Sequence, residues 1–338
     1  MEIITATDQS QWDAFVTSHP EANFLQSWAW GEFHSSRGKQ IVRRIAVKDN
    51  KILAAYTGQV ETARRGKYLA IAGGPILDWA DKSLVKAIFA DIKQQGTAMG
   101  CVFVRVRPQL DLSDQSLKLM RTLGLAKAPI YLSVEHAGIL DLTKSEEEIL
   151  TNASQRLRRT LRKAQKENII IETSTDPADI KEFYKIQLET AGRHGFVSFS
   201  EDFLTKQFAA FAARHQATLY TAKLDGQILA QNFMIFYGAE ASYHYGVSSQ
   251  LGTQLSSAPL LHIQAMQDAR ERGITRYNFW GIVDEDDTSH RFWGVSQFKR
   301  GFGVTDLRYT PAHDLILKPV LYKLTKTYET LRRHHRHV

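Results

Sequence analysis

A short block that occurs twice constrains this chain more than any other feature of its 338 residues. Residues 49–54 (Asp-Asn-Lys-Ile-Leu-Ala) reappear 176 positions later as residues 225–230 (Asp-Gly-Gln-Ile-Leu-Ala). In both copies a charged or glycine-containing pair separates two apolar, β-prone runs, which is the pattern of a β-hairpin. The block therefore predicts the same hairpin at two places along the chain.

The elements that follow each copy also match in order. Each copy leads into a β-prone strand, a helix with one apolar face, a glycine and a second strand. These elements are residues 67–72, 84–95, 100 and 101–106 after the first copy, and 241–247, 257–272, 273 and 275–280 after the second. Two such series in one chain indicate a duplicated α/β domain.

Composition favours two ordinary folded domains in a reducing compartment. Of all residues, 43% are hydrophobic, which is enough for two cores. The single cysteine, Cys101, falls in an expected buried strand and is interpreted as a small core residue. The sequence shows neither a signal peptide nor an apolar run approaching the roughly 20 residues that span a bilayer. We therefore expect a cytoplasmic location.

Positive charge is concentrated in two segments. The formal net charge of +7 and the pI of about 9.3 favour an anionic partner, such as nucleic acid, a phosphorylated substrate or a membrane surface. One segment is an expected helix over residues 154–167; the other is the tail from residue 314, an amphipathic helix that Pro319 starts or kinks. Their basic residues are Arg156, Arg158, Arg159, Arg162, Lys163 and Lys166, and Lys318, Lys323, Lys326, Arg332, Arg333 and Arg336. Solvated helix faces are the alternative interpretation of both.

Missing motifs exclude several classes of enzyme. The sequence has no Walker loop, no His-Glu-x-x-His, no Cys-x-x-Cys and no Gly-x-Ser-x-Gly. Residues 121–126 match the Arg-x-x-Gly-x-Ala pattern of coenzyme A pyrophosphate loops, but such a loop must lead from a strand into a helix. Here Gly124 ends an expected helix instead. We therefore expect no coenzyme A site, no other cofactor and no metal.

Four stretches, in order along nearly the whole chain, resemble the Fem family of peptidoglycan-bridge aminoacyltransferases. The most specific combines Tyr-Asn-Phe-Trp-Gly-Ile with a later Phe-Lys-Arg-Gly-Phe-Gly. The stretches are residues 24–33, 154–164, 190–196, and 277–282 with 298–303.

The resemblance implies an α/β (α+β) fold of two tandem acetyltransferase-like (GNAT-type) domains, each a mixed central sheet flanked by helices. It implies domain 1 at residues 1–148, domain 2 at residues 149–310, and a basic helix at residues 311–338 that packs back on domain 1. Some members carry a long helical arm in the second domain. This sequence has no room for it, so it resembles the compact members.

The same resemblance implies transfer of an amino acid from aminoacyl-tRNA to the stem-peptide amine of a peptidoglycan precursor, either lipid II or UDP-MurNAc-pentapeptide. The amine attacks an ester that is already activated, so the enzyme needs no nucleophile of its own, which accounts for the absent triads. Two alternatives stay open. One is an acyltransferase of the same fold that uses an acyl-CoA or another donor, and the other is a non-enzymatic RNA-binding protein.

In the second domain the resemblance assigns the catalytic role to Lys299, which would stabilise the charge that develops at the tRNA end. The alternative is a surface lysine whose stem packs on Phe302. Arg193 would contact precursor phosphates, which suit a guanidinium fork. Phe298 would stack on the terminal adenine of the tRNA, with core packing as the alternative. Tyr243 and Tyr245 alternate along a strand, so we expect both rings on one side, either lining the precursor site or forming a core pair.

The first domain departs from the family pattern. Where some members carry a lysine that grips the precursor, this chain has His34, on the same helix as the candidate substrate-binding residue Trp30. Arg105 or Arg107, at the end of the strand that contains Cys101, is a candidate substitute for that grip. No general base is assigned, because the acidic residues 284–287 are either a carboxylate loop or a solvated turn.

The basic helices acquire roles under this resemblance. A tRNA acceptor stem would be attracted to the first helix without any sequence being read. Its candidate contacts are Arg156, Arg158, Arg159, Arg162 and Lys163. The tail helix would lie near anionic lipid if the acceptor is membrane-anchored, which adds a peripheral location at the inner face of the membrane.

Overall fold

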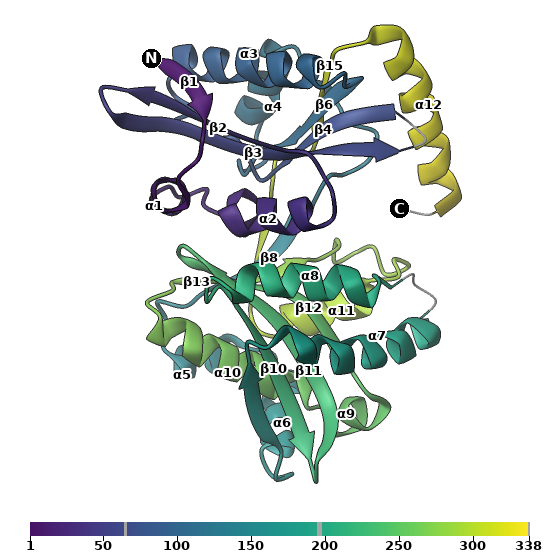
Figure 1. Ribbon diagram of the computed structural model, residues 1–338. Coiled ribbons are helices and arrows are strands. Elements are labelled where there is room, and N and C mark those ends of the chain that lie inside the picture. Colours follow the sequence, from purple (N-terminus) through teal and green to yellow (C-terminus); the bar gives the residue numbers. More distant parts are fainter. Residues whose placement is uncertain (64–65, 195–197, 337–338) are drawn as a thin grey trace. The chain divides into compact units, whose positions relative to one another are not determined.

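Two β-sheets, each with its own helices, organise the chain in the computed structural model (Figure 1). The structure describes residues 1–63, 66–194 and 198–336, apart from the side chains of residues 193–194 and 332–336. It contains two compact units. The expected α/β (α+β) class, with mixed sheets flanked by helices, is confirmed.

The first unit comprises Met1–Glu135 and Arg308–Val338. Its sheet has the order β1-β2-β3-β4-β6-β15-β7, with β5 paired to β3. The strands are β1 (Glu2–Thr5), β2 (Ile41–Lys48), β3 (Lys51–Ala63), β4 (Gly66–Ala72), β5 (Ile76–Leu77), β6 (Phe103–Arg107), β7 (Ala126–Lys127) and β15 (His313–Ile316). The helices are α1 (Gln9–Thr17), α2 (Trp28–Ser36), α3 (Lys82–Ala98), α4 (Asp114–Thr122) and α12 (Pro319–Arg336), with a short 3-10 turn at Phe24–Gln26.

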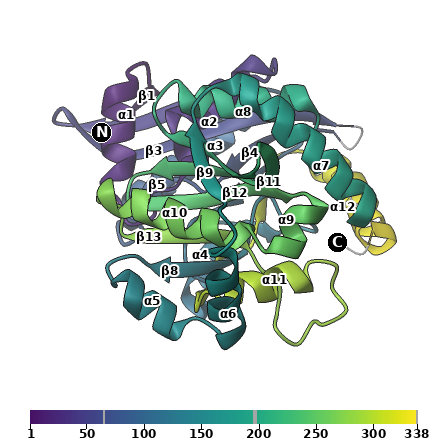
Figure 2. The ribbon, with the colours of Figure 1, turned by 90° about the horizontal axis from the view of Figure 1, so that it is seen from below.

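The second unit comprises His136–Leu307, and its sheet has the order β14-β8-β13-β12-β11-β10-β9. The strands are β8 (His136–Asp141), β9 (Ile170–Ser174), β10 (Ala217–Leu224), β11 (Gln227–Tyr237), β12 (Glu240–Ser248), β13 (Arg276–Gly281) and β14 (Thr305–Arg308). The helices are α5 (Glu146–Asn152), α6 (Gln155–Ala164), α7 (Ile180–His194), α8 (Glu201–Ala212), α9 (Gln250–Leu255), α10 (Ala258–Glu271) and α11 (Trp293–Arg300), with a 3-10 turn at Pro177–Asp179. Figure 2 shows α5, α6 and α10 beside β8 and β13. No described helix of this unit exceeds the 15 residues of α7, so this part of the chain carries no long arm.

The repeated block forms the same hairpin in both sheets. The turn residues Asp49 and Asn50 have φ of 51° and 61°, and Asp225 and Gly226 have φ of 48° and 80°. Positive φ at both central residues is the type I′ geometry that suits the twist of a two-residue hairpin. Each hairpin also has a register shift at the equivalent place, after Ala46 in one and after Ala222 in the other. The predicted duplication is therefore present down to the irregularities of the strands.

In each sheet, one strand that lies next to a unit boundary in the sequence pairs with a strand far away in the sequence. β8 directly follows the first unit but pairs antiparallel with β13, where Leu140 lies opposite Tyr277. β15 follows the second unit but pairs antiparallel with β6, where Leu315 lies opposite Val104. The first boundary accordingly lies between residues 135 and 136 and not at 148, because residues 136–141 are a strand of the second sheet; the return to the first unit lies between 307 and 308.

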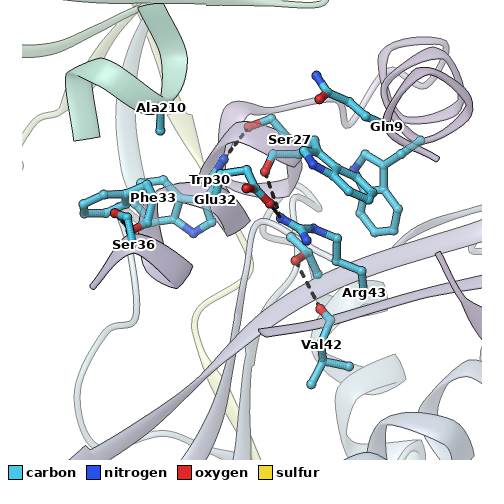
Figure 3. A network of polar contacts seen from close by, with 12 residues as sticks. Gln9, Ser27, Trp30, Glu32, Phe33, Ser36, Val42, Arg43 and Ala210 are labelled. Carbon is cyan, nitrogen blue, oxygen red and sulfur yellow. Dashed lines mark hydrogen bonds and ion pairs between the residues drawn. The ribbon is translucent and has the colours of Figure 1, made fainter. Parts of the chain in front are cut away.

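The motif Trp-Ala-Trp-Gly-Glu has a structural explanation in α2. The guanidinium of Arg43 lies 4.0 Å from the centre of the Trp28 ring and donates to the carboxylate of Glu32 at 2.7 Å (Figure 3). The guanidinium lies against the helix at Gly31, and a Cβ atom at position 31 would overlap its Nη2 atom. Only glycine leaves room for this cation against the helix.

We predict that Gly31→Ala destabilises the protein by about 1–3 kcal/mol, because the added methyl group must displace the Arg43 guanidinium. Gly192→Ala is the matched control, since Gly192 also lies within a helix but has no atom within 4 Å of its Cβ position. It should stabilise the protein by about 0.5–1 kcal/mol through its better helix propensity. Urea unfolding of both variants measures this, and equal effects of the two substitutions would contradict the packing argument.

Candidate active site

The second sheet opens between two of its parallel strands. β12 and β13 are paired over three positions, from Glu240 opposite Arg276 to Ser242 opposite Asn278. β12 then continues to Ser248 without pairing to β13. The side chains that follow the last pair on each strand therefore border a gap in the hydrogen-bonded sheet.

The equivalent position in the first sheet is closed. β4 and β6 are paired over five positions, from Tyr68 opposite Phe103 to Ala72 opposite Arg107. The buried side-chain amide of Gln26 donates to the carbonyl of Ala72 at 2.7 Å. Because the strands stay together there, the duplicated fold offers this opening in its second unit.

Lys299 occupies the opening. It lies on α11 and is 7% exposed. Its Nζ atom donates to the carbonyl oxygen of Gly281, at the end of β13, at 2.7 Å and lies 5.7 Å from the centre of the Tyr243 ring on β12. Arg300 fixes the helix by donating to the carbonyl of Val283 at 2.7 Å. The amine thus bridges the two strands where they part.

Burial lowers the pKa of the Lys299 amine to about 7. Desolvation disfavours the charged form of a lysine, and no opposing charge contributes to this shift. An anion entering the opening would supply the missing charge and raise the pKa again. The site is therefore suited to a group that becomes negative during a reaction, or to a phosphate.

A neutral histidine lies beside the amine. Burial, together with the charge of Lys299, lowers the pKa of His262 to about 3. Its Nδ1 atom is hydrogen-bonded to the hydroxyl of Tyr277 at 2.7 Å. His262 was not singled out from the sequence, because a lone histidine on a helix carries no signal until its neighbours are known.

Trp280 lies in the most specific of the resembling stretches, but the sequence assigned no role to it. Its φ of 62° is in the left-handed region, which is unusual for a large side chain. The side chain of Asn278 accepts from its backbone amide at 2.7 Å and holds this conformation. Backbone strain of this kind concentrates at functional sites, and here it lies where β13 leaves β12.

Phe298 packs in the core. Its ring lies 5.5 Å from the ring of His262 and 5.5 Å from that of Phe302. The core-packing alternative accounts for this placement; stacking on a tRNA base remains only a proposal.

The expectation that Tyr243 and Tyr245 share one side of the strand is wrong. Tyr243 packs against His262 of α10, whereas Tyr245 packs against Phe199 and Phe233. The reason is a β-bulge: β11 and β12 shift register between Tyr243 and Tyr245, so the simple alternation of side chains is lost. Tyr243 borders the opening beside Lys299, and Tyr245 belongs to a separate aromatic group.

His34 is not suited to grip a phosphate. Its ring is buried beside Trp30, at 4.8 Å between ring centres. Burial lowers its pKa to about 3, with the charges of Arg37 and Lys39 acting in the same direction, so the ring is neutral at physiological pH. Trp30 itself is half-buried and packs on Phe24 and Phe33, which gives it a structural role in α2 (Figure 3).

The buried guanidinium of Arg105 forms an ion cluster with two carboxylates. Its guanidinium binds Asp314 through two hydrogen bonds of 2.7 and 2.8 Å, and Glu329 of α12 at 2.8 Å. The Tyr322 hydroxyl also donates to Asp314, at 2.9 Å. Contact with a substrate phosphate is therefore the wrong role for Arg105, which instead fastens β15 and α12 to β6.

The basic face of α6 is largely exposed, with one exception. Arg156, Arg159, Arg162 and Lys163 are exposed, while Leu157 and Leu161 are buried beneath them. Arg158 is partly buried and donates to backbone carbonyls at the end of α5, including that of Thr151 at 2.6 Å. Arg158 thus caps a helix and is not available as a cation for RNA.

Three predictions remain: Arg193, the acidic loop at residues 284–287 and the absence of a metal site. The side chain of Arg193 lies outside the described residues, although its backbone is in α7. In the acidic loop, Asp284 pairs with His136 at 3.2 Å, and residues 285–287 are exposed, as in a solvated turn. Among the residues that the structure describes, no group of histidine, cysteine and acidic side chains could hold a metal ion.

The coenzyme A pattern at residues 121–126 is a helix stop, as predicted. Gly124 has φ of 75°, and the amide of Leu125 donates back to the carbonyl of Met120 at 3.0 Å. This is the geometry that ends α4 and not the start of a phosphate-binding helix.

Two family models match different parts of the chain. Residues 7–128 match the model of the FemAB family, and residues 151–300 match that of the acetyltransferase (GNAT) domain. The lipid II:glycine glycyltransferase of Staphylococcus aureus is 22% identical over 402 residues, covering 96% of this chain and 95% of that protein.

Solved structures share the fold. A crystal structure of FemX has a TM-score of 0.87 at 21% identity and covers 96% of this chain and 99% of its own. A tandem GNAT protein from the clavulanic acid biosynthesis pathway has a TM-score of 0.51 at 11% identity and covers 94% of this chain and 98% of its own. The second likeness agrees with the duplication inferred from the repeated hairpin.

We predict that Lys299→Met stabilises the protein by about 2–4 kcal/mol at neutral pH, because the wild-type chain must bury an amine that is charged when unfolded. The folded pKa is about 7, and the unfolded value is roughly 10.4. Between these values the unfolded chain holds a proton that the folded protein lacks, so wild-type stability rises with pH across this window. The advantage of the variant is therefore full below about pH 7 and lost near pH 10.

Urea unfolding from about pH 6 to about pH 10 measures this difference. Lys86→Met is the control, because Lys86 is exposed on α3 and its removal should leave the pH dependence unchanged. A Lys299→Met variant that is less stable than wild type at every pH would contradict the assignment of a desolvated amine.

Proposed function

We propose that this chain is a member of the FemAB family, whose model matches residues 7–128, and that it transfers an amino acid from aminoacyl-tRNA to the stem-peptide amine of a peptidoglycan precursor. The observation that carries the proposal is the desolvated amine of Lys299 in the opening between β12 and β13. A relative over nearly the whole chain is a lipid II:glycine glycyltransferase, which supports a precursor acceptor and glycine as the first amino acid to test.

The chemistry of aminoacyl transfer fits a site without a nucleophile. The acceptor amine forms a bond to the carbonyl carbon of the aminoacyl ester, and the bond to the ribose oxygen breaks. The proton that the amine loses ends on that ribose oxygen, directly or through water, so the products are an amide and a free hydroxyl. Negative charge develops first on the carbonyl oxygen and then on the leaving ribose oxygen. The protein's task is to hold the two reactants together and to stabilise that charge.

Lys299 is proposed to supply this stabilisation. With a pKa of about 7 the free site holds the amine near the midpoint of its titration. The phosphates and the developing oxyanion of the donor would favour the charged form, so the cation would be complete when the donor is bound. The Gly281 carbonyl fixes the direction of the amine, and no reorganisation is then needed during the reaction.

A second candidate function is supported by the match of residues 151–300 to the GNAT domain model. An acyl-CoA donor would need a loop that presents helix-end amides to a pyrophosphate. The one sequence that matches such a loop ends α4 instead, which favours the aminoacyl-tRNA donor.

The proposal is tested by incubating the protein with labelled glycyl-tRNA and either lipid II or UDP-MurNAc-pentapeptide. We predict transfer that Lys299→Met slows by about 100- to 1,000-fold in kcat, with little change in KM for the precursor. Lys86→Met serves as the exposed-lysine control. Transfer from an acyl-CoA, with none from any aminoacyl-tRNA, would contradict the proposal.

The pH profile separates a cationic role from a merely structural one. Because the charged form of Lys299 is the proposed active one, kcat/KM should carry a limb that falls as pH rises through about 7. Lys299→Arg should lose that limb while keeping part of the activity, since a guanidinium stays charged throughout. A limb that persists in Lys299→Arg would assign the titration to another group.

The exposed face of α6 is proposed to attract the tRNA acceptor stem. Replacing Arg159 and Arg162 by alanine should weaken tRNA binding and reduce the slope of log K against log salt concentration by roughly 1 for each phosphate that is no longer neutralised. Lys206→Ala is the control, because Lys206 is partly exposed on α8 and already paired with Asp202. Filter binding at several salt concentrations measures both, and an unchanged slope would remove α6 from the tRNA surface.

A further inference from the structure

Helix α12 packs on its own unit with polar side chains inward. Tyr322, Thr325 and Glu329 are buried, at 4%, 5% and 1% exposure. Their spacing places them on one face of the helix. Glu329 and Tyr322 belong to the cluster around Arg105, and the Tyr322 ring also packs on Phe103 at 5.5 Å. The buried cation on β6 therefore fixes which face of α12 turns inward.

The apolar residues of α12 consequently face outward. Val320 is 76% exposed and Leu324 is 67% exposed. With Tyr328 and Leu331 they recur at intervals of four, four and three residues along one side of the helix, and Leu321 lies beside them. We call these five residues the α12 stripe. It is a continuous apolar surface held outward by the polar contacts behind it.

Exposed lysines lie beside this stripe. Lys323 and Lys326 are exposed on the helix, and Lys318 is exposed just before it; the sequence continues with Arg332, Arg333 and Arg336, whose side chains lie outside the described residues. Glu329 is the single acidic residue of α12, and it is bound to Arg105. The exposed part of the helix thus combines an apolar stripe with cations that have no acid on the same helix to offset them.

We propose that the α12 stripe docks on the surface of an anionic phospholipid bilayer. Leucine and valine side chains would enter the boundary between headgroups and acyl chains, while the lysines would meet lipid phosphates. No helix in the described part of the chain is long and apolar enough to cross a membrane. The helix would therefore lie in the plane of the interface.

The charge pattern favours lipid over a second copy of this chain. Two α12 stripes packed together would bring Lys323 and Lys326 of one copy near those of the other, and the only carboxylate of α12 is already bound to Arg105. An anionic bilayer supplies both the apolar phase and the negative charge. This surface goes beyond the proposed transfer reaction and does not depend on it.

Sedimentation with vesicles tests the proposal on the full-length protein. Wild type should bind vesicles of phosphatidylcholine with about 30 mol% phosphatidylglycerol, and bind phosphatidylcholine vesicles at least about tenfold more weakly. Leu324→Asn should lower binding to the anionic vesicles about tenfold, and Lys323→Glu with Lys326→Glu should lower it by a similar factor. High salt should weaken wild-type binding in the same direction.

Ile170→Asn is the matched control, because Ile170 is 64% exposed in the second unit and lies far from α12 in sequence. It should change vesicle binding by about twofold or less. Equal losses in Ile170→Asn and Leu324→Asn would overturn the assignment to α12. Absence of wild-type binding would overturn the proposal, as would self-association abolished by Leu324→Asn without any vesicle binding.

Transfer to the water-soluble precursor separates this proposal from the enzymatic one. Leu324→Asn should leave that transfer unchanged while vesicle binding falls. Vesicle binding without any transfer activity would leave the docking surface intact and remove the proposed function. Equal loss of soluble transfer and of vesicle binding in Leu324→Asn would show that the stripe serves the fold, which would overturn the docking proposal.

Discussion

The hydrogen bond from the buried amine of Lys299 to the carbonyl of Gly281 is the interaction on which the functional account depends. It holds a desolvated amine between two parallel strands that part after three paired positions. Burial there disfavours the charged form of the amine, and burial together with the charge of Lys299 lowers the pKa of the neighbouring His262. An anion bound beside Lys299 would therefore stabilise the charged form of the amine. A reaction in which negative charge develops would place such an anion where the two strands part.

The two copies of the duplicated fold differ in how far their parallel strands stay paired. In the first sheet the strands equivalent to β12 and β13 remain paired, and Gln26 closes their end. The cation of that sheet, Arg105, is neutralised by Asp314 and Glu329 and serves to attach β15 and α12. In the second sheet the strands part, and no opposing charge offsets the desolvation of Lys299. The cation of the first sheet is thus neutralised by carboxylates, whereas the amine of the second is not.

Much of the fold could be predicted from the sequence, because the hairpin turn, the helix stop at Gly124 and the order of elements depend on local preferences. The pairing of β8 with the second sheet could not, since nothing in residues 136–141 indicates which sheet they join. The return of the carboxyl-terminal segment to the first unit was implied by the family resemblance and not by local preferences. Lys299 was identified by resemblance, but its burial was not. Tyr245 and Arg105 were misassigned because a β-bulge and a distant carboxylate pair leave no trace in local spacing. The inward polar face of α12 was missed for the same reason.

The most direct measurement of the central claim is the pKa of Lys299 itself, followed by NMR of proteins labelled with ¹³C at the lysine Cε, with the Lys299→Met variant to assign the signal. The account predicts one lysine that titrates near 7 in the free protein, with its pKa raised by about one unit or more when aminoacyl-tRNA is bound. A Lys299 signal that titrates at the ordinary value of roughly 10.4, or that does not respond to the donor, would contradict it.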